Sequence, residues 1–315
     1  MIDLNDIRRA RERLRPTLTP TPLVLDHELS RRLARRVWLK GELFQCTGSF
    51  KARGALNWLA TASGEELAGG LGAVSAGNHA LGLAWAARQA GVAVTIVMPE
   101  NASPFKVEGS RALGAEVILH GDINDAWSRM HALVAERGLT LVHPYDDERI
   151  IAGQGTVALE LLEQAPEATA LLCPIGGGGL ISGIGVAVDA LRPEMSLIGV
   201  EPAGAASMAH AWARGGPAKL ARVSTCAKSL AAATVGEHTY PLCRRHVDTL
   251  LQVDEAAIHA AMHHLLYRAK LVVEPGAVVA AAALLEGIAP LPPEGDVMVV
   301  ITGGNIGREE LRDHL

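Results

Sequence analysis

The sequence predicts an α/β protein made of two open, parallel-sheet domains. Apolar stretches of strand length alternate with helical stretches from about residue 70, and the alternation restarts after Tyr145. Apolar strands separated by helices at this spacing are typical of parallel sheets covered on both faces. The chain has 315 residues, of which 49% are hydrophobic, so it is long enough to form two such cores.

The first run of elements lies between residue 70 and Tyr145. Four stretches are predicted to be strands: LGAVSAG, VAVTIVMP, AEVILHG and LTLVHP. Three stretches between them have the apolar spacing of helices: NHALGLAWAARQAG, SPFKVEGSRALG and NDAWSRMHALVAERG. We therefore expect a small α/β domain over residues 70–146.

The second run predicts a larger domain. Helices are expected at QGTVALELLEQ and LISGIGVAVDAL, and strands at ALLCPIG and MSLIGVEP. The N-terminal segment and the strand GDVMVVITGGN complete this domain, which we assign to residues 1–69 and 147–315. No low-complexity linker separates the two domains, so we expect them to pack closely.

Composition excludes several classes of function. The net charge of −5 and the scarcity of aromatic residues argue against a nucleic-acid partner. The N-terminus lacks an apolar leader and the longest apolar run, AVVAAAALL, is too short to span a bilayer, so we expect a cytoplasmic protein. The four cysteines are scattered without ligand spacing, which favours neither disulfides nor a metal site.

Lys51 is the first candidate for chemistry. It lies in GSFKARGA, where a loop of small residues is predicted to become a helix. Free N–H groups in a first helical turn disfavour an ammonium ion, so we expect them to push Lys51 toward its neutral form. A neutral lysine is a nucleophile and a base, although a lysine considered alone is more often a solvated surface residue.

A run of glycines is the second candidate. Gly176, Gly177, Gly178 and Gly179 follow an apolar strand and precede a helix, where backbone N–H groups can hold a phosphate. Dinucleotide binding is the rival interpretation, since Glu201 ends the next strand at the distance of a ribose-binding acid. Against it, Ser182 stands where the third glycine of that pattern belongs. A Walker A loop is excluded because no Gly-Lys-Ser/Thr follows.

The turn from Ser75 to His79 is the third candidate. It follows a predicted strand and opens a helix, at the sheet edge where α/β proteins bind ligands. Its backbone and side-chain donors suit a carboxylate, and Asn78 is free to bond a ring hydroxyl. The alternative is that Asn78 and His79 only cap the helix.

Taken in order, six stretches resemble the motifs of the fold-type II pyridoxal-phosphate enzymes: TGSFKARGA, SAGNHALGLAWAA, HPYDDERIIAGQGT, GGGGLISG, VVEPGA and ITGGN. The resemblance covers nearly the whole chain and is strongest to the threonine/serine dehydratase and serine racemase branch. It implies a fold like that of the tryptophan synthase β chain, with pyridoxal 5'-phosphate held by the large domain.

The resemblance also implies roles for individual residues. Lys51 is the Schiff-base lysine, Phe50 packs on the cofactor ring, and Asn78 bonds the ring hydroxyl. Thr302 falls against the pyridine nitrogen, which a neutral hydroxyl leaves a weaker electron sink than an aspartate would. The phosphate is assigned to Gly176, Gly177, Gly178 and Gly179, and the substrate carboxylate to Ser75, Ala76, Gly77, Asn78 and His79.

Four positions either allow two interpretations or depart from the family pattern. Glu274 in VVEPGA is equally compatible with a buried structural acid and with a group near the substrate. Lys228 and Ser229 replace an acid and a glycine that the family usually carries, so the substrate is open, although a surface position for Lys228 is favoured. Ser207 replaces a second acid that serine racemases use with a divalent ion, so we expect no metal.

These observations predict an ammonia-lyase that converts a small L-β-hydroxy amino acid to a 2-oxo acid and ammonia. L-Threonine and L-serine are the default substrates, with hydroxyaspartate, phenylserine or a hydroxyectoine-pathway compound as alternatives. Racemisation is disfavoured because the similar racemases carry a serine where this chain has Ala76. We expect a homo-oligomer, either a dimer or a tetramer. A dinucleotide-dependent oxidoreductase and a non-catalytic binder of small ligands remain the rival classes.

Overall fold

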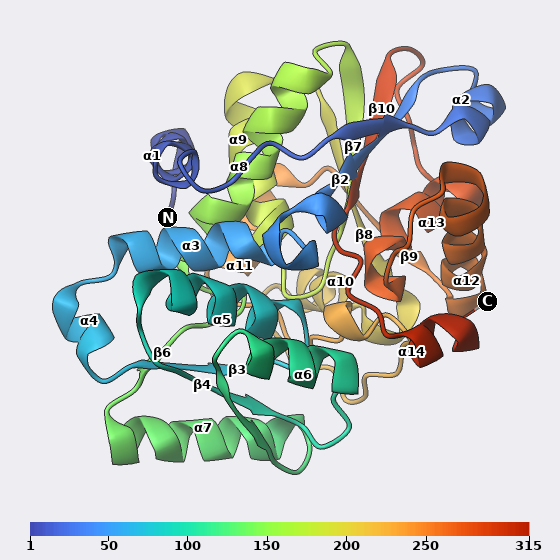
Figure 1. Ribbon diagram of the computed structural model, residues 1–315. Coiled ribbons are helices and arrows are strands. Elements are labelled where there is room, and N and C mark those ends of the chain that lie inside the picture. The colour runs from blue at the N-terminus through green and yellow to red at the C-terminus, as the bar shows by residue number, and fades with distance from the viewer. Residues whose placement is uncertain (315) are drawn as a thin grey trace.

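A computed structural model describes residues 1–314 and contains two sheets, each with helices on both faces. Figure 1 shows the larger sheet in the upper part of the molecule and the smaller sheet, between α5 and α7, in the lower part. The mixed α/β architecture with mainly parallel sheets confirms the predicted fold class.

The larger sheet has six strands in the order β1-β2-β10-β7-β8-β9. All neighbours are parallel except β1 and β2. The strands are β1 (Leu23–Leu25), β2 (Val37–Gly41), β7 (Ala168–Pro174), β8 (Ser196–Pro202), β9 (Thr249–Val253) and β10 (Asp296–Ile301). The sequence did not predict strands β1 and β2, which lie in the N-terminal segment, or the edge strand β9.

Helices cover both faces of this sheet, which explains why every residue of β10 is buried. Met298 and Val300 face one core, whereas Val297, Val299 and Ile301 face the other. The first core is formed with α1 (Leu4–Leu14), α8 (Glu148–Gln164), α9 (Gly179–Leu191) and α11 (Thr239–His246). The second is formed with α2 (His27–Leu33), α12 (Glu255–His264) and α13 (Val279–Leu285). The remaining helices near this sheet are α10 (Ser207–Arg214) and α14 (Arg308–Asp313).

The smaller sheet is fully parallel, with the order β5-β4-β3-β6. Its strands are β3 (Leu71–Val74), β4 (Val94–Met98), β5 (Glu116–Leu119) and β6 (Thr140–Leu141). Its helices are α4 (Gly64–Ala68), α5 (Asn78–Ala90), α6 (Pro104–Ala112) and α7 (Ile123–Arg137). The predicted strand LTLVHP is thus a two-residue strand followed by a loop.

Helix α3 (Lys51–Thr61) connects the two parts of the molecule, because it packs against both α5 and α8. Gly54 and Gly153 permit the close approach of α3 and α8: a Cβ added at Gly153 would lie 2.7 Å from the Cα of Gly54. Any residue at the start of α3 is therefore placed between the two sheets.

A buried ionic network anchors α3. The guanidinium of Arg53 donates to both carboxylate oxygens of Glu42 at 2.8 Å, and it also pairs with Glu160. The ammonium group of Lys40, on β2, donates to the same Glu160 at 2.7 Å. Burial of such charges is tolerated only when each is paired, so this network fixes α3 against β2 and α8.

None of the helices described between residues 1 and 314 combines the length and the apolar character that a membrane crossing requires.

Candidate functional site

Lys51 lies in the first turn of α3, with Phe50 as the preceding cap residue. Its ammonium group donates a hydrogen bond of 2.6 Å to the carbonyl of Pro144. Gly82 of α5 faces the Lys51 backbone so closely that a Cβ there would lie 3.0 Å from the Lys51 carbonyl carbon. Burial lowers the pKa of the Lys51 amine to about 8. The shift has the expected direction, and its cause is the loss of solvent around the amine.

The glycine loop lies between β7 and α9. The backbone N–H groups of residues 176–181 have no hydrogen-bond acceptor among the described residues, and the regular helical bonding starts with Ser182 N–H to Gly178 O at 2.9 Å. Gly178 adopts a φ of +94°, which strongly favours glycine. A loop of free N–H groups that continues into a helix N-terminus is a site for an anion.

The carbonyl groups of this loop are turned toward the protein interior. Gly177 O accepts a hydrogen bond from Thr239 Oγ1 at 2.8 Å, and Gly176 O accepts one from Ser207 Oγ at 3.4 Å. Because these acceptors are occupied, the loop presents donors rather than acceptors to a ligand.

The segment His143–Asp147 connects Lys51 with the glycine loop. Pro144 receives the Lys51 hydrogen bond, and the next residue, Tyr145, packs its ring on the loop, where a Cβ at Gly177 would lie 2.4 Å from Tyr145 Cδ1. Tyr145 is held by a 3.0 Å hydrogen bond from its hydroxyl to Thr234 O. No role was expected for this segment, although HPYDD at a strand end was the available signal.

The turn Ser75–His79 lies at the carboxyl end of β3. The N–H groups of Ala76, Asn78 and His79 have no acceptor among residues 1–314, and a Cβ added at Gly77 would meet no atom within 4 Å. The backbone therefore offers donors next to open space, as expected for a carboxylate site.

The imidazole of His79 does not take part in that turn. It is buried and its Nε2 lies 3.1 Å from the carbonyl of Val142. Burial, reinforced by the charge of Lys51, lowers the pKa of His79 to about 3, so the ring is neutral. His79 thus contributes its backbone N–H to the turn, whereas its side chain belongs to the interior.

Asn78 is oriented by two partners. Its Nδ2 donates to Oε1 of Glu274, and its Oδ1 accepts from Asn305 Nδ2 at 2.9 Å. Glu274 is itself paired with the buried Lys106, at 2.7 Å. Glu274 is therefore a buried acid that holds the Asn78 amide, which leaves the second Nδ2 hydrogen of Asn78 available to a ligand.

Phe50 and Thr302 are brought next to each other at the end of β10. The Phe50 N–H donates to the Thr302 carbonyl at 3.2 Å, and Ser49 pairs with Gly303 in an isolated antiparallel bridge. Lys51 Nζ also lies 5.1 Å from the centre of the Phe50 ring. The structure thus gathers the stretches around Lys51, Asn78 and Thr302, which are far apart in the sequence.

The residues that supported rival interpretations lie elsewhere. Glu201 is fully buried and its carboxylate accepts the N–H groups of Met208 and Ala209, at 2.7 and 2.9 Å, as a cap of α10. It is therefore not positioned for a ribose. Lys228 is exposed in a 3₁₀ turn, whereas its neighbour Leu230 packs against Gly176.

Comparison with known proteins identifies the family. Residues 14–303 match the family described as pyridoxal-phosphate dependent enzyme. The chain belongs to this family. Its residues fit that cofactor, because an aldehyde requires an amine that loses its proton readily, as the lowered pKa of Lys51 allows, and a phosphate requires free N–H donors such as those of residues 176–181.

The chain is similar over most of its length to several individual members of the family. The chain is 41% identical to an L-threonine ammonia-lyase of Thermotoga maritima, over 97% of this chain and 76% of the relative. It is 38% identical to a phenylserine dehydratase of Ralstonia pickettii, over 99% of this chain and 96% of that protein. The structure of maize serine racemase superposes with a TM-score of 0.93 at 34% identity, covering 99% of this chain and 96% of the other.

Proposed function

We propose that this pyridoxal-phosphate enzyme is an L-threonine/L-serine ammonia-lyase, which converts the β-hydroxy amino acid to a 2-oxo acid and ammonia. The observation that carries the proposal is the half-buried Lys51, whose amine has a pKa of about 8, in a chain similar over 97% of its length to an L-threonine ammonia-lyase. Such an amine is available as a base near neutral pH.

We assign the roles as follows. Lys51 binds the cofactor and moves the proton, while Asn78, Phe50 and Thr302 orient the cofactor ring. The cofactor, when bound, supplies an electron sink that acidifies the substrate Cα–H bond. The phosphate is assigned to Gly176, Gly177, Gly178 and Gly179, and the substrate carboxylate to the turn Ser75, Ala76, Gly77, Asn78 and His79, the last through its backbone N–H.

In this assignment the turn holds the carboxylate so that the Cα–H bond faces Lys51. The neutral Lys51 amine takes the Cα proton, the electron pair of that bond forms a double bond to Cβ, and the Cβ–O bond breaks. The hydroxyl group leaves as water after it gains the proton that Lys51 has taken, which returns Lys51 to its neutral form. The released enamine is hydrolysed to the 2-oxo acid and ammonia. The overall reaction therefore needs no oxidant or reductant.

Borohydride labelling tests the assignment of Lys51. Purified protein is expected to be yellow, and reduction is expected to attach the cofactor to the peptide that contains Lys51. Lys51→Ala should lose both the label and the lyase activity, whereas Lys228→Ala, which changes an exposed lysine, should retain both. Labelling of a different lysine, or a colourless protein that binds a nicotinamide dinucleotide, would contradict the proposal.

Phenylserine is the second candidate substrate, because the phenylserine dehydratase is similar over nearly the full length of both chains. A panel of L-threonine, L-serine, L-threo-3-phenylserine and 3-hydroxyaspartate, assayed for 2-oxo acid, separates the candidates. The largest kcat/KM for threonine or serine supports the first proposal, and the largest for phenylserine supports the second.

We also propose that the enzyme works in the cytoplasm in amino-acid catabolism and is a homodimer or homotetramer. No helix within residues 1–314 has the length and apolar character of a membrane crossing, which agrees with this location. Light scattering of the purified protein measures the assembly directly, and a monomeric mass would contradict this part of the proposal.

A further inference from the structure

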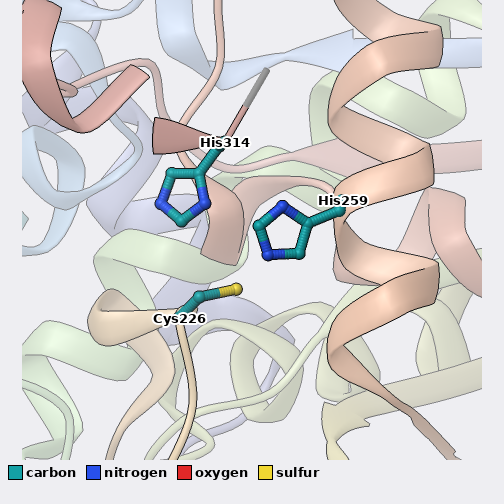
Figure 2. A group of neighbouring side chains, drawn as sticks. All are labelled: Cys226, His259 and His314. Carbon is teal, nitrogen blue, oxygen red and sulfur yellow. The ribbon is translucent and has the colours of Figure 1, made fainter. Parts of the chain in front are cut away.

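Three potential metal ligands converge outside the proposed catalytic site. Cys226, His259 and His314 each offer one ligand atom, and these atoms all lie within 4.8 Å of one another. Figure 2 shows their side chains pointing toward a common space. They come from three separate segments: the loop after α10, the middle of α12 and the end of α14. Their sequence spacing therefore gave no signal, and the sequence predicted no metal.

A fourth donor lies beside them. Glu255 is one helical turn before His259 on α12, so the two side chains share a face of the helix. Its Oε2 accepts the Cys226 N–H at 2.7 Å, which places the carboxylate next to the thiol. Its Oε1 is buried and has no hydrogen-bond partner among the described residues.

A second polar atom of the cluster also lacks a partner. The Nδ1 atom of His314 is buried and makes no hydrogen bond within residues 1–314. Its ring lies 5.0 Å, centre to centre, from the ring of His259. Two buried polar atoms without partners in one cluster are costly unless another group satisfies them.

We propose that Cys226, His259, His314 and Glu255 form a Zn²⁺ site. One sulfur, two imidazole nitrogens and one carboxylate oxygen are the ligand types that Zn²⁺ prefers, in its usual number of four. Tetrahedral zinc sites place ligand atoms about 3.3–3.8 Å apart. The ligand atoms of Cys226, His259 and His314, which lie within 4.8 Å of one another, reach this spacing by side-chain rotations, and the Glu255 side chain turns toward them to complete the site.

The charges balance when the ion binds. The Cys226 thiol releases its proton to the solvent, the imidazoles bind as neutral rings, and the thiolate and the carboxylate together neutralise Zn²⁺. Without a cation, burial and the adjacent Glu255 raise the pKa of the Cys226 thiol to about 12. A bound cation removes this obstacle, because it stabilises the thiolate directly.

The proposed ion would hold together three segments around the larger sheet. Cys226 lies just before the 3₁₀ turn Lys228–Leu230, whose Leu230 packs on Gly176 of the glycine loop. The ion would thus fix this turn against α12 and α14. Its role is structural, because all four protein ligands are used and no position is left for a substrate.

Zinc titration of the purified holoenzyme, without a histidine tag and after removal of metal, tests the site. A colorimetric chelator that competes for Zn²⁺ measures the affinity. One tight equivalent per chain is expected for the wild type. Cys226→Ser and His259→Ala, which remove direct ligands, are each expected to weaken the affinity by more than the roughly 10–100-fold that loss of an outer partner costs. Cys46→Ser and His263→Ala are matched controls outside the cluster and should bind like the wild type.

Cobalt provides a second readout that reports the thiolate itself. Co²⁺ added to the wild type and to His263→Ala should add a thiolate-to-metal charge-transfer band to the absorption spectrum of the cofactor. The difference spectrum of Cys226→Ser, with and without Co²⁺, should lack this band. Circular dichroism and cofactor absorbance show that each variant is folded. Absence of a tight equivalent, equal zinc affinity in wild type and Cys226→Ser, or Co²⁺ binding without the band would overturn the proposal.

Discussion

The ammonium nitrogen of Lys106 on α6 lies 2.7 Å from Oε2 of Glu274, so a buried ion pair joins the smaller-sheet part of the molecule to the segment before α13. The other oxygen of Glu274 accepts the Asn78 amide. A single carboxylate thus connects the position of α6 with the orientation of a residue assigned to the cofactor.

Removal of one partner from this pair is expected to destabilise the protein. Lys106→Met leaves the Glu274 charge buried without its cation, which should cost about 3–5 kcal/mol in the free energy of unfolding. Arg129→Ala breaks an exposed pair with Glu136 and should cost about 1 kcal/mol or less. Urea denaturation measures both values. Equal losses of unfolding free energy in the two variants would show that the buried pair stabilises the protein no more than the exposed pair does.

The lowered pKa of Lys51 predicts a pH dependence of the apoprotein. The folded state releases the Lys51 proton at about pH 8, whereas the unfolded chain holds it to its ordinary pKa of 10.5. The unfolded state therefore binds more protons across this window, so the Lys51 contribution to stability increases as pH rises from 8 to 10.5. Between pH 8 and 10.5 the urea midpoint of the wild type should increase relative to that of Lys51→Met. Midpoints that change in parallel with pH would contradict the lowered pKa of Lys51.

Two glycine substitutions should have different effects. In Gly177→Ala the new Cβ would lie 2.4 Å from the Tyr145 ring, so the loop has to move and cofactor affinity should fall by about 10-fold or more. In Gly77→Ala the new methyl group enters open space where we place the substrate, so KM should rise while cofactor affinity stays unchanged. Equilibrium dialysis of cofactor and steady-state kinetics separate the two effects.

Thr302 is expected to control the fate of the deprotonated substrate. An aspartate at this position would hold a proton on the ring nitrogen and strengthen its electron withdrawal, which should shift the balance from elimination toward side reactions. Thr302→Ser should be mild. The ratio of 2-oxo acid to other products, measured for Thr302→Asp, tests this prediction. An unchanged ratio would show that Thr302 does not contact the ring nitrogen.

Ala76 is expected to keep the enzyme from racemising its substrate. Racemisation requires an acid/base group on the face opposite Lys51, and the methyl group of Ala76 cannot transfer a proton. Absence of one such group typically costs about 10²–10⁴-fold. His79 does not replace it, because its neutral ring faces the Val142 carbonyl. Chiral chromatography of products from L-serine should find D-serine rising only in Ala76→Ser, whereas abundant D-serine from the wild type would contradict the prediction.

The alternation of strands and helices could be predicted from the sequence because it depends on local patterns of apolar residues. The placement of Lys51 in the first turn of α3 followed from the same kind of signal. Strand β1 was missed because it has only three residues, and β9 because its half-buried residues lack a continuous apolar run.

Contacts between distant segments could not be predicted. The pairs Arg53–Glu160 and Lys106–Glu274 join residues more than 100 positions apart, and charged residues alone do not reveal their partners. The cause of the Lys51 pKa shift was missed for the same reason, since burial depends on how α5 and the Pro144 segment pack around the amine. The cluster of Cys226, His259 and His314 also exists only after folding.

The position of β10 determines when the larger sheet can form during synthesis. β10 is translated after every other strand, yet it lies between β2 and β7 in the interior of the sheet. The smaller sheet, in contrast, uses only strands from a continuous part of the chain and can assemble earlier. Until β10 leaves the ribosome, β2 and β7 each have one edge without a hydrogen-bonded partner. Such open strand edges favour aggregation or chaperone binding. Thr302, which we assign to the cofactor ring, follows β10 directly, so the proposed cofactor site is complete only after β10 has been translated.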